Sequence, residues 1–243
     1  MALLNNRVAL VTGASRGIGR AVAISLADAG AAVAVNYREK AADARDVAET
    51  IRKAGGRAMA IGADVSRATD VADMMSAVEG ELGPVDVLVN NAGIGLVRTV
   101  DDLTEEDFDR TIAVNLKSAF LCTQAVIPGM RARKWGRIVN ISSGAARGAG
   151  GVGPHYNASK AGMEGMTRGY AARLVKDGIT VNAVAPSLIE TDMVRSGLAS
   201  SAARIPLGRF GTPEECAQAV LMVIGNAYMT GQTVALSGGL SFI

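Results

Sequence analysis

The sequence is poor in the residues that build metal clusters and disulfide frameworks. It contains one histidine and only two cysteines, Cys122 and Cys216, which lie far apart. A histidine-based metal cluster is therefore excluded, and neither a disulfide framework nor a thiolate metal site is indicated. Aromatic residues make up 4% of the 243 residues, whereas hydrophobic residues make up 49%. We therefore expect an aliphatic core of Ala, Val, Ile, Leu and Met.

The chain also lacks a strong charge of either sign, because 25 basic and 23 acidic residues give a formal net charge of +2. This balance does not suggest a nucleic acid or another polyanion as a partner. No hydrophobic run approaches the length of a membrane span, and residues 1–7 lack the apolar core of a signal peptide. We therefore expect a cytoplasmic protein with no membrane or nucleic-acid partner.

Short β-branched runs alternate with helical patterns along the whole chain. The predicted strands cover residues 7–12, 31–35, 57–61, 85–89, 137–141, 179–185 and 232–236. The helical patterns cover residues 20–29, 40–54, 68–82, 101–134, 156–176 and 213–225. Thr104 and Thr212 are placed to cap two of these helices. The alternation predicts an α/β fold: one Rossmann-type domain over residues 1–243, with a doubly wound, parallel seven-stranded sheet covered by helices on both faces.

The first predicted strand runs into a glycine-rich turn that opens a helix. Gly13, Gly17 and Gly19 have the spacing G-x-x-x-G-x-G, rather than the common G-x-G-x-x-G. Glycines allow backbone N–H groups to approach a pyrophosphate, which is also favoured at the positive end of a helix dipole. A three-glycine turn on its own is a weak signal, because it is also compatible with a simple loop.

The second predicted strand ends without the acidic residue that bonds the ribose of NAD. Asn36-Tyr37-Arg38 follows it instead, and Arg16 lies inside the glycine turn. An arginine here accommodates the 2′-phosphate of NADP, so the two arginines together favour NADP(H). Either arginine alone would be read as a solvated surface charge. Asp64 and Val65 follow the third strand, where we expect contact with an adenine ring.

A candidate catalytic pair lies at the start of the helical pattern over residues 156–176. Tyr156 and Lys160 are four positions apart, which places them on one face of a helix. An adjacent ammonium group stabilises a phenolate, so we expect the Tyr156 pKa to fall from about 10 toward neutrality. Such a tyrosine exchanges a proton with an alcohol or carbonyl oxygen. The alternative is an ordinary helix with one buried and one solvated side chain. Asn115, polar in an apolar run, is either a structural hydrogen-bonding residue or part of a site.

These motifs together resemble the short-chain dehydrogenase/reductase family over essentially the whole chain. They occur in the family order: Thr12-Gly13-x-x-x-Gly17-x-Gly19, Asp64, Asn90-Asn91-Ala92-Gly93, Asn115, Ser143, Tyr156-x-x-x-Lys160 and Pro186 through Thr191. Within the family, the chain is most similar to bacterial 3-oxoacyl-[acyl-carrier-protein] reductases. That similarity is carried by Arg16 and by residues 36–38, 135–143 and 205–209.

The resemblance implies hydride transfer between a nicotinamide ring and a carbonyl or alcohol carbon. Ser143, rather than Ser142, would polarise the substrate oxygen, and Tyr156 would be the general acid in the reducing direction. Lys160 would lower the Tyr156 pKa and bond the nicotinamide ribose, while Asn115 would hold a water that resupplies the proton. The cofactor-binding residues implied are Gly13, Ser15, Arg16, Gly17, Ile18, Gly19, Asn36, Tyr37, Arg38, Asp64, Val65, Asn91, Ala92, Gly93, Tyr156, Lys160, Pro186, Ile189 and Thr191. His155 fits no role in this scheme and is predicted to be a loop residue.

The expected function is therefore NADPH-dependent reduction of 3-oxoacyl thioesters by a homotetramer, with acyl carrier protein as a candidate partner. Two alternatives stay open: a dehydrogenase for a free small alcohol, ketone or sugar, and a non-catalytic dinucleotide-binding sensor. Three departures from the reductases concern the substrate. Ser187 replaces a glycine, Asp177 stands where a basic residue can occur, and a lid predicted at about 190–210 is short.

A basic cluster, Arg131, Arg133 and Lys134, ends the predicted helix that carries Asn115. Positive charge at a helix C-terminus complements the helix dipole, which is a structural explanation. The family arrangement would instead place the cluster near the pocket mouth, where it would attract an acidic carrier protein. The sequence is compatible with both explanations.

Overall fold

The computed structural model describes residues 3–192 and 202–242. Seven parallel strands form one sheet in the order β3-β2-β1-β4-β5-β6-β7. Their bounds are β1 Val8–Val11, β2 Ala32–Tyr37, β3 Ala58–Gly62, β4 Val87–Asn90, β5 Gly136–Ile141, β6 Ile179–Pro186 and β7 Thr233–Leu236. The predicted α/β fold class is confirmed, and each strand lies within two residues of its predicted bounds.

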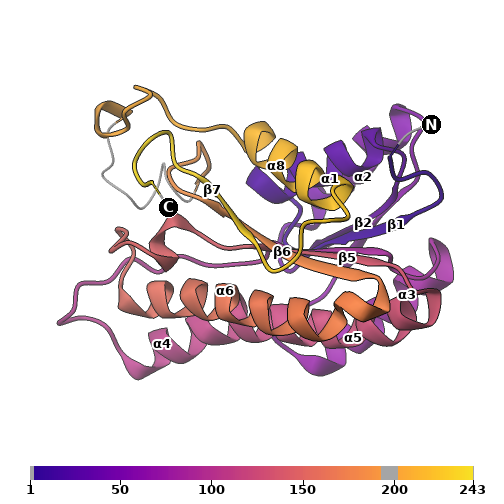
Figure 1. Ribbon diagram of the computed structural model, residues 1–243, viewed down its shortest axis with the longest axis horizontal. Helices are drawn as coiled ribbons and strands as arrows, with labels where there is room; N and C mark the ends of the chain where they lie inside the picture. Colours follow the sequence, from indigo (N-terminus) through magenta and orange to yellow (C-terminus); the bar gives the residue numbers. More distant parts are fainter. Residues whose placement is uncertain (1–2, 193–201, 243) are drawn as a thin grey trace.

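The helices cover both faces of the sheet (Figure 1). On one face lie α1 Gly17–Asp28, α2 Ala41–Lys53 and α8 Pro213–Gly225. On the other lie α3 Ala68–Glu81, α4 Glu105–Ile112, α5 Ser118–Arg133 and α6 Pro154–Leu174. Each face has its own hydrophobic core. Among the buried hydrophobic residues of the described chain, Tyr156 is the one aromatic, so the aliphatic core is as predicted.

Local sequence sets the helix starts. The Thr104 hydroxyl accepts a hydrogen bond from the Asp107 amide at 3.1 Å, and Thr212 forms a reciprocal capping box with Glu215. Both predicted caps are confirmed. The helix predicted over 101–134 differs, because it begins at Glu105 and contains a π-helical turn, Ala113–Lys117. In the described part of the chain, no helix is both long and apolar enough to cross a membrane.

The strand order fixes where a ligand would bind. The chain builds the sheet outward from β1 to β3, then returns to β4 beside β1 and continues to the other edge. Loops after β1 and β4 therefore diverge to opposite faces and leave a crevice at the carboxyl ends of the strands. The glycine turn, the loop after β4, the segment after β5 and the segment after β6 all reach this crevice.

Candidate active site

A cavity of about 680 Å³ occupies the crevice at the carboxyl edge of the sheet. Every residue predicted from the sequence to bind cofactor lines this cavity, and so does Ser143. Asn115 is the one predicted site residue that does not. Lining residues that the sequence did not single out include Arg20, Glu39, Ile94, Val114, Glu190 and Asp192. Residues scattered along the chain thus meet at one place, which no local pattern could have shown.

The glycine turn is shaped for close approach of a ligand backbone. Gly13 and Gly17 have φ angles of +62° and +54°, in the left-handed region that favours glycine. A Cβ on Gly19 would lie 2.4 Å from the Asn91 side-chain nitrogen, which itself donates to the carbonyls of Thr12 and Gly13. The first turn of α1 contains no acidic residue, and the side chain of its N-cap residue, Arg16, makes no capping hydrogen bond to the backbone of that turn. The turn therefore fits an anionic group such as a pyrophosphate.

Asn36 ties the glycine turn to the sheet. Its side chain is 1% exposed, and its oxygen accepts a hydrogen bond from the Gly13 amide at 3.1 Å. Its nitrogen donates to the carbonyls of Ile61 and Ala63, each at 3.3 Å. The oxygen and the nitrogen of the Asn36 side chain are thus both hydrogen-bonded within the protein. Asn36 therefore shapes the cavity wall by holding the neighbouring backbone segments in place.

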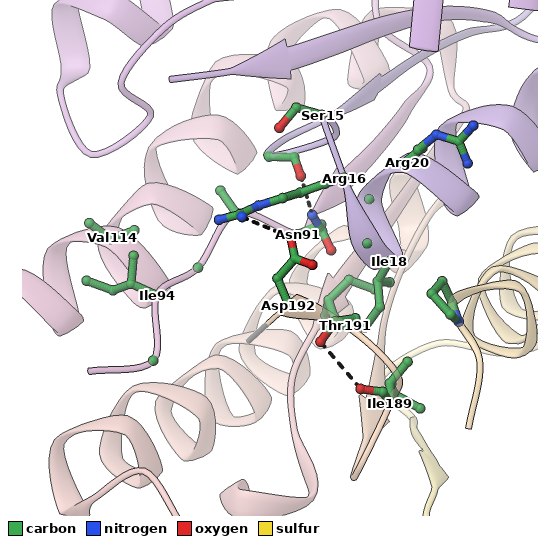
Figure 2. Close-up of a pocket in the computed structure, with 18 of the residues that line it drawn as sticks. Ser15, Arg16, Ile18, Arg20, Asn91, Ile94, Val114, Ile189, Thr191 and Asp192 are labelled. Atoms are coloured by element: carbon green, nitrogen blue, oxygen red, sulfur yellow. Dashed lines mark hydrogen bonds and ion pairs between the residues drawn. The ribbon is translucent and has the colours of Figure 1, made fainter. Parts of the chain in front are cut away.

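The two predicted phosphate-binding arginines border the cavity and each has a carboxylate partner. Arg16 reaches from the glycine turn to Asp192, with 3.0 Å between Nη1 and Oδ2 (Figure 2). Arg38 forms an ion pair with its neighbour Glu39. Burial opposes ionisation of Asp64, but hydrogen bonds from Ser66 and attraction to Arg38 outweigh it and lower the Asp64 pKa. The Arg16–Asp192 and Arg38–Glu39 ion pairs are exposed and therefore weak, so an anionic ligand competes with them readily.

Ser143, Tyr156 and Lys160 meet at the cavity wall formed by β5 and α6. The Tyr156 phenol is 9% exposed and Lys160 is 4% exposed. The Ser143 hydroxyl accepts a hydrogen bond from the Ala145 amide at 3.2 Å, and its interaction with the Tyr156 phenol favours the ionised form of the phenol. The Lys160 ammonium lies 5.8 Å from the centre of the Tyr156 ring and donates to the Ile141 carbonyl at 2.8 Å. Burial lowers the Lys160 pKa to about 8.

The prediction that the Tyr156 pKa falls is wrong for this structure. Burial raises the pKa of the phenol above its ordinary value, and the hydrogen bond from Ser143 offsets this only in part. The Lys160 ammonium donates a hydrogen bond to the Ile141 carbonyl, and this interaction weakens its stabilisation of the Tyr156 phenolate. A phenol with a raised pKa is protonated at neutral pH, which is the form that donates a proton.

Asn115 holds α6 to the loop after β4. It is fully buried in the π-helical turn. Its amide nitrogen donates to the Ile94 carbonyl at 3.0 Å and to the Ser159 hydroxyl at 3.2 Å, while its oxygen accepts from the Ile94 amide at 2.8 Å. Ser159 in turn donates to the Tyr156 carbonyl at 2.7 Å. This geometry favours the structural reading of Asn115, and the water-holding role stays a prediction.

His155 is not a loop residue, contrary to the prediction. It is fully buried in the first turn of α6, and its Nε2 lies 3.0 Å from the Leu96 carbonyl oxygen. The histidine therefore joins the loop after β4 to the residue beside Tyr156. From the sequence alone, a polar side chain next to a glycine-rich segment is expected to be exposed to solvent. In the fold, the Leu96 carbonyl provides the hydrogen-bond partner that permits burial of His155.

Ser142 and Ser143 both line the cavity, but their hydroxyls have different partners. Ser142 is buried, with its hydroxyl 3.2 Å from Glu164 and 3.3 Å from the Lys160 carbonyl oxygen. Glu164 was missed because a single glutamate in a helix carries no sequence signal except its position on the Tyr156 face. Ser187 borders the cavity close to this segment, because a Cβ on Gly144 would lie 2.4 Å from its hydroxyl oxygen.

The basic cluster at residues 131–134 lies away from the cavity within one chain. It ends α5 just before β5 begins at Gly136, so it lies at the amino edge of the sheet, opposite the cavity (Figure 1). Arg131 and Lys134 pair with Asp177 at 2.8 and 3.3 Å, and Arg133 pairs with Asp86 at 3.1 Å. The prediction that this cluster borders the mouth of its own pocket is therefore wrong. Of the lid predicted at about 190–210, residues 193–201 lie outside the described residues.

Comparison with known proteins gives a consistent result. The family model for short chain dehydrogenases matches residues 7–201. The chain is 42% identical over 244 residues to a 3-oxoacyl-[acyl-carrier-protein] reductase of Synechocystis sp., covering 99% of each chain. It is 43% identical over 249 residues to the corresponding reductase of Pseudomonas aeruginosa, covering 98% of each. A solved structure of a putative gluconate dehydrogenase from Agrobacterium tumefaciens superposes with a TM-score of 0.93 at 32% identity, covering 99% of this chain and 98% of that one.

Proposed function

The chain belongs to the short chain dehydrogenase family, and on that premise we propose that it is an NADPH-dependent reductase of 3-oxoacyl thioesters. Family membership makes it an oxidoreductase that interconverts C=O and CH–OH with a nicotinamide dinucleotide. The observation that carries the finer proposal is the convergence of Ser143, Tyr156 and Lys160 on a cavity whose other end is the glycine turn. The full-length similarity to two reductases of that name supports the substrate class.

The catalytic residues can handle the oxygen of a ketone. A bound nicotinamide dinucleotide would supply the hydride to the carbonyl carbon. The Ser143 and Tyr156 hydroxyls would donate hydrogen bonds to the carbonyl oxygen, and Tyr156 would give its proton to that oxygen as the alcohol forms. The Lys160 ammonium, held by the Ile141 carbonyl, would stabilise the phenolate that Tyr156 leaves behind.

NADP(H) is the proposed cofactor because two arginines border the adenosine end of the cavity and no acid stands at position 36. A 2′-phosphate would form charge-assisted hydrogen bonds with Arg16 and Arg38. It would compete with Asp192 and Glu39, whose pairs with these arginines are exposed. Glu39 disfavours a phosphate by its charge, so the preference for NADPH over NADH depends on both arginines.

Assembly into a homotetramer is part of the proposal. Phe120 on α5 is 44% exposed, and Val175 just after α6 is 48% exposed. Near the C-terminus, Tyr228 and Phe242 are 100% and 91% exposed. Large apolar side chains on two separate faces favour contacts with two further copies. Acyl carrier protein is the proposed donor of the substrate, in line with the names of the two reductases.

The test is a spectrophotometric screen of NADPH oxidation with acetoacetyl-CoA, cyclic ketones and sugar ketones. The proposal expects the highest kcat/KM with acetoacetyl-CoA, which stands in for the carrier-bound substrate. A second candidate, oxidation of a free sugar or polyol, is favoured by the structural similarity to a putative gluconate dehydrogenase. Activity on sugars with no activity on the thioester would replace the first proposal by the second.

A further inference from the structure

Glu164 is a buried carboxylate on α6 that the proposed reaction does not use. Its side chain is 5% exposed and lies on the helix face that carries Tyr156 and Lys160. A buried carboxylate is destabilising unless it is paired. Glu164 has two partners: one oxygen accepts from the Ser142 hydroxyl at 3.2 Å, and the other accepts from Arg147 Nε at 2.9 Å.

These two partners bracket Ser143. Ser142 precedes it directly, and Arg147 follows the 3₁₀ turn Gly144–Ala146 that begins after it. One carboxylate therefore fixes both ends of the Ser143 segment to the helix that carries Tyr156. The side-chain nitrogen of Asn157 adds a third connection between the segment and the helix, because it donates a hydrogen bond to the Ala145 carbonyl at 2.9 Å.

Stability alone does not account for this arrangement. A buried ion pair is often replaced by apolar residues with no loss of stability, because removing two charges from water offsets their attraction. What the pair provides is a fixed geometry between a loop and a helix. The two groups fixed in this way, Ser143 and Tyr156, are those that must reach the same substrate oxygen.

We propose that Glu164 is a positioning residue, which acts through Ser142 and Arg147 to hold the Ser143 hydroxyl beside the Tyr156 phenol. This inference rests on the proposed function, because it requires Ser143 to bind the substrate oxygen. Displacement of a catalytic group by about 1 Å can lower a rate about 100-fold. Glu164→Gln should therefore lower kcat by about 10- to 100-fold and leave the KM for NADPH unchanged.

A double-mutant cycle with Ser143→Ala tests the route of this effect. Turnover of the best substrate in the screen is measured for the wild type, each single variant and the double variant. If Glu164 acts through Ser143, Glu164→Gln lowers kcat in the wild type but not in the Ser143→Ala background. Losses that multiply, or no loss in the wild type, would overturn the inference alone. Full turnover by Ser143→Ala would overturn the proposed role of Ser143 as well.

Three further variants separate positioning from general destabilisation. Asp86→Asn breaks a comparably buried carboxylate pair at the opposite edge of the sheet, so it should lower Tm without lowering kcat. Arg147→Lys keeps the cation beside Glu164 and should retain more turnover than Arg147→Met. The comparison of these two variants keeps the proposal testable if Glu164→Gln does not fold. Equal kcat losses in Asp86→Asn and Glu164→Gln, or in both Arg147 variants, would contradict it.

Discussion

Lys160 is a buried cation whose ionisation is coupled to folding. Burial lowers its pKa from 10.5 to about 8 in the folded protein. Between these two pH values the unfolded chain binds a proton that the folded protein does not. The free energy of unfolding must therefore rise with pH across this interval. Below pH 8 the folded protein carries the full cost of burying the ammonium group, and above pH 10.5 that cost is absent.

The expected size of this effect follows from the pKa change. At about 1.4 kcal/mol per pKa unit, the wild type should gain about 2–3 kcal/mol of unfolding free energy relative to Lys160→Met between pH 7 and pH 10. Methionine preserves the aliphatic packing of the side chain but cannot titrate. The comparison removes other titrating groups, because both proteins share them. Urea unfolding followed by circular dichroism at fixed protein concentration measures the difference at each pH.

An exposed lysine provides the matched control. Lys176 lies just after the end of α6, and the unfolding curves of Lys176→Met should follow those of the wild type over the same pH range. Parallel pH dependence of the wild type and Lys160→Met would show that the buried ammonium keeps its ordinary pKa. The electrostatic account of the site would then be wrong, since it depends on strong desolvation at Lys160.

Further predictions concern chemistry, cofactor choice and assembly. Tyr156→Phe should lower kcat by at least about 10²–10⁴-fold with an unchanged circular dichroism spectrum, and near-normal turnover would refute the role of the phenol. Arg38→Ala removes a charge-assisted bond of about 1.5–3 kcal/mol, so the KM for NADPH should rise about tenfold or more while that for NADH barely changes. A wild type that prefers NADH would contradict the assignment of both arginines. Light scattering should show a tetramer, and a monomer at micromolar concentration would reject the proposed assembly.

The fold could be predicted from the sequence because its determinants are local. Buried parallel strands are short apolar runs, and each of the seven runs became a strand. The caps at Thr104 and Thr212 depend on residues three positions away, so they too were visible. The π-helical turn at Ala113–Lys117 was not, because it reflects the tertiary contacts of Asn115 with Ile94 and Ser159 rather than local propensity.

The site residues could be named from the sequence, but their electrostatics could not. Whether Lys160 lowers the Tyr156 pKa depends on where its ammonium points, and that is set by the Ile141 carbonyl of β5. Burial of the phenol depends on elements far away in the sequence. The i, i+4 spacing predicts proximity on a helix face, and proximity alone does not give the sign of a pKa shift when desolvation opposes it.

The position of the basic cluster at residues 131–134 follows from the topology of the parallel sheet, which was itself predicted from the sequence. In a parallel sheet each helix runs back toward the amino edge, so its C-terminus lies opposite the carboxyl edge where ligands bind. Arg131 and Arg133 follow Asn115 by more than four helical turns, which carries them from one edge of the sheet to the other. Pairing with Asp177 and Asp86 then balances their charge locally. Under the proposed function, the side chains of one chain that would tune substrate binding are those beside Ser143 and Tyr156, among them Ser187.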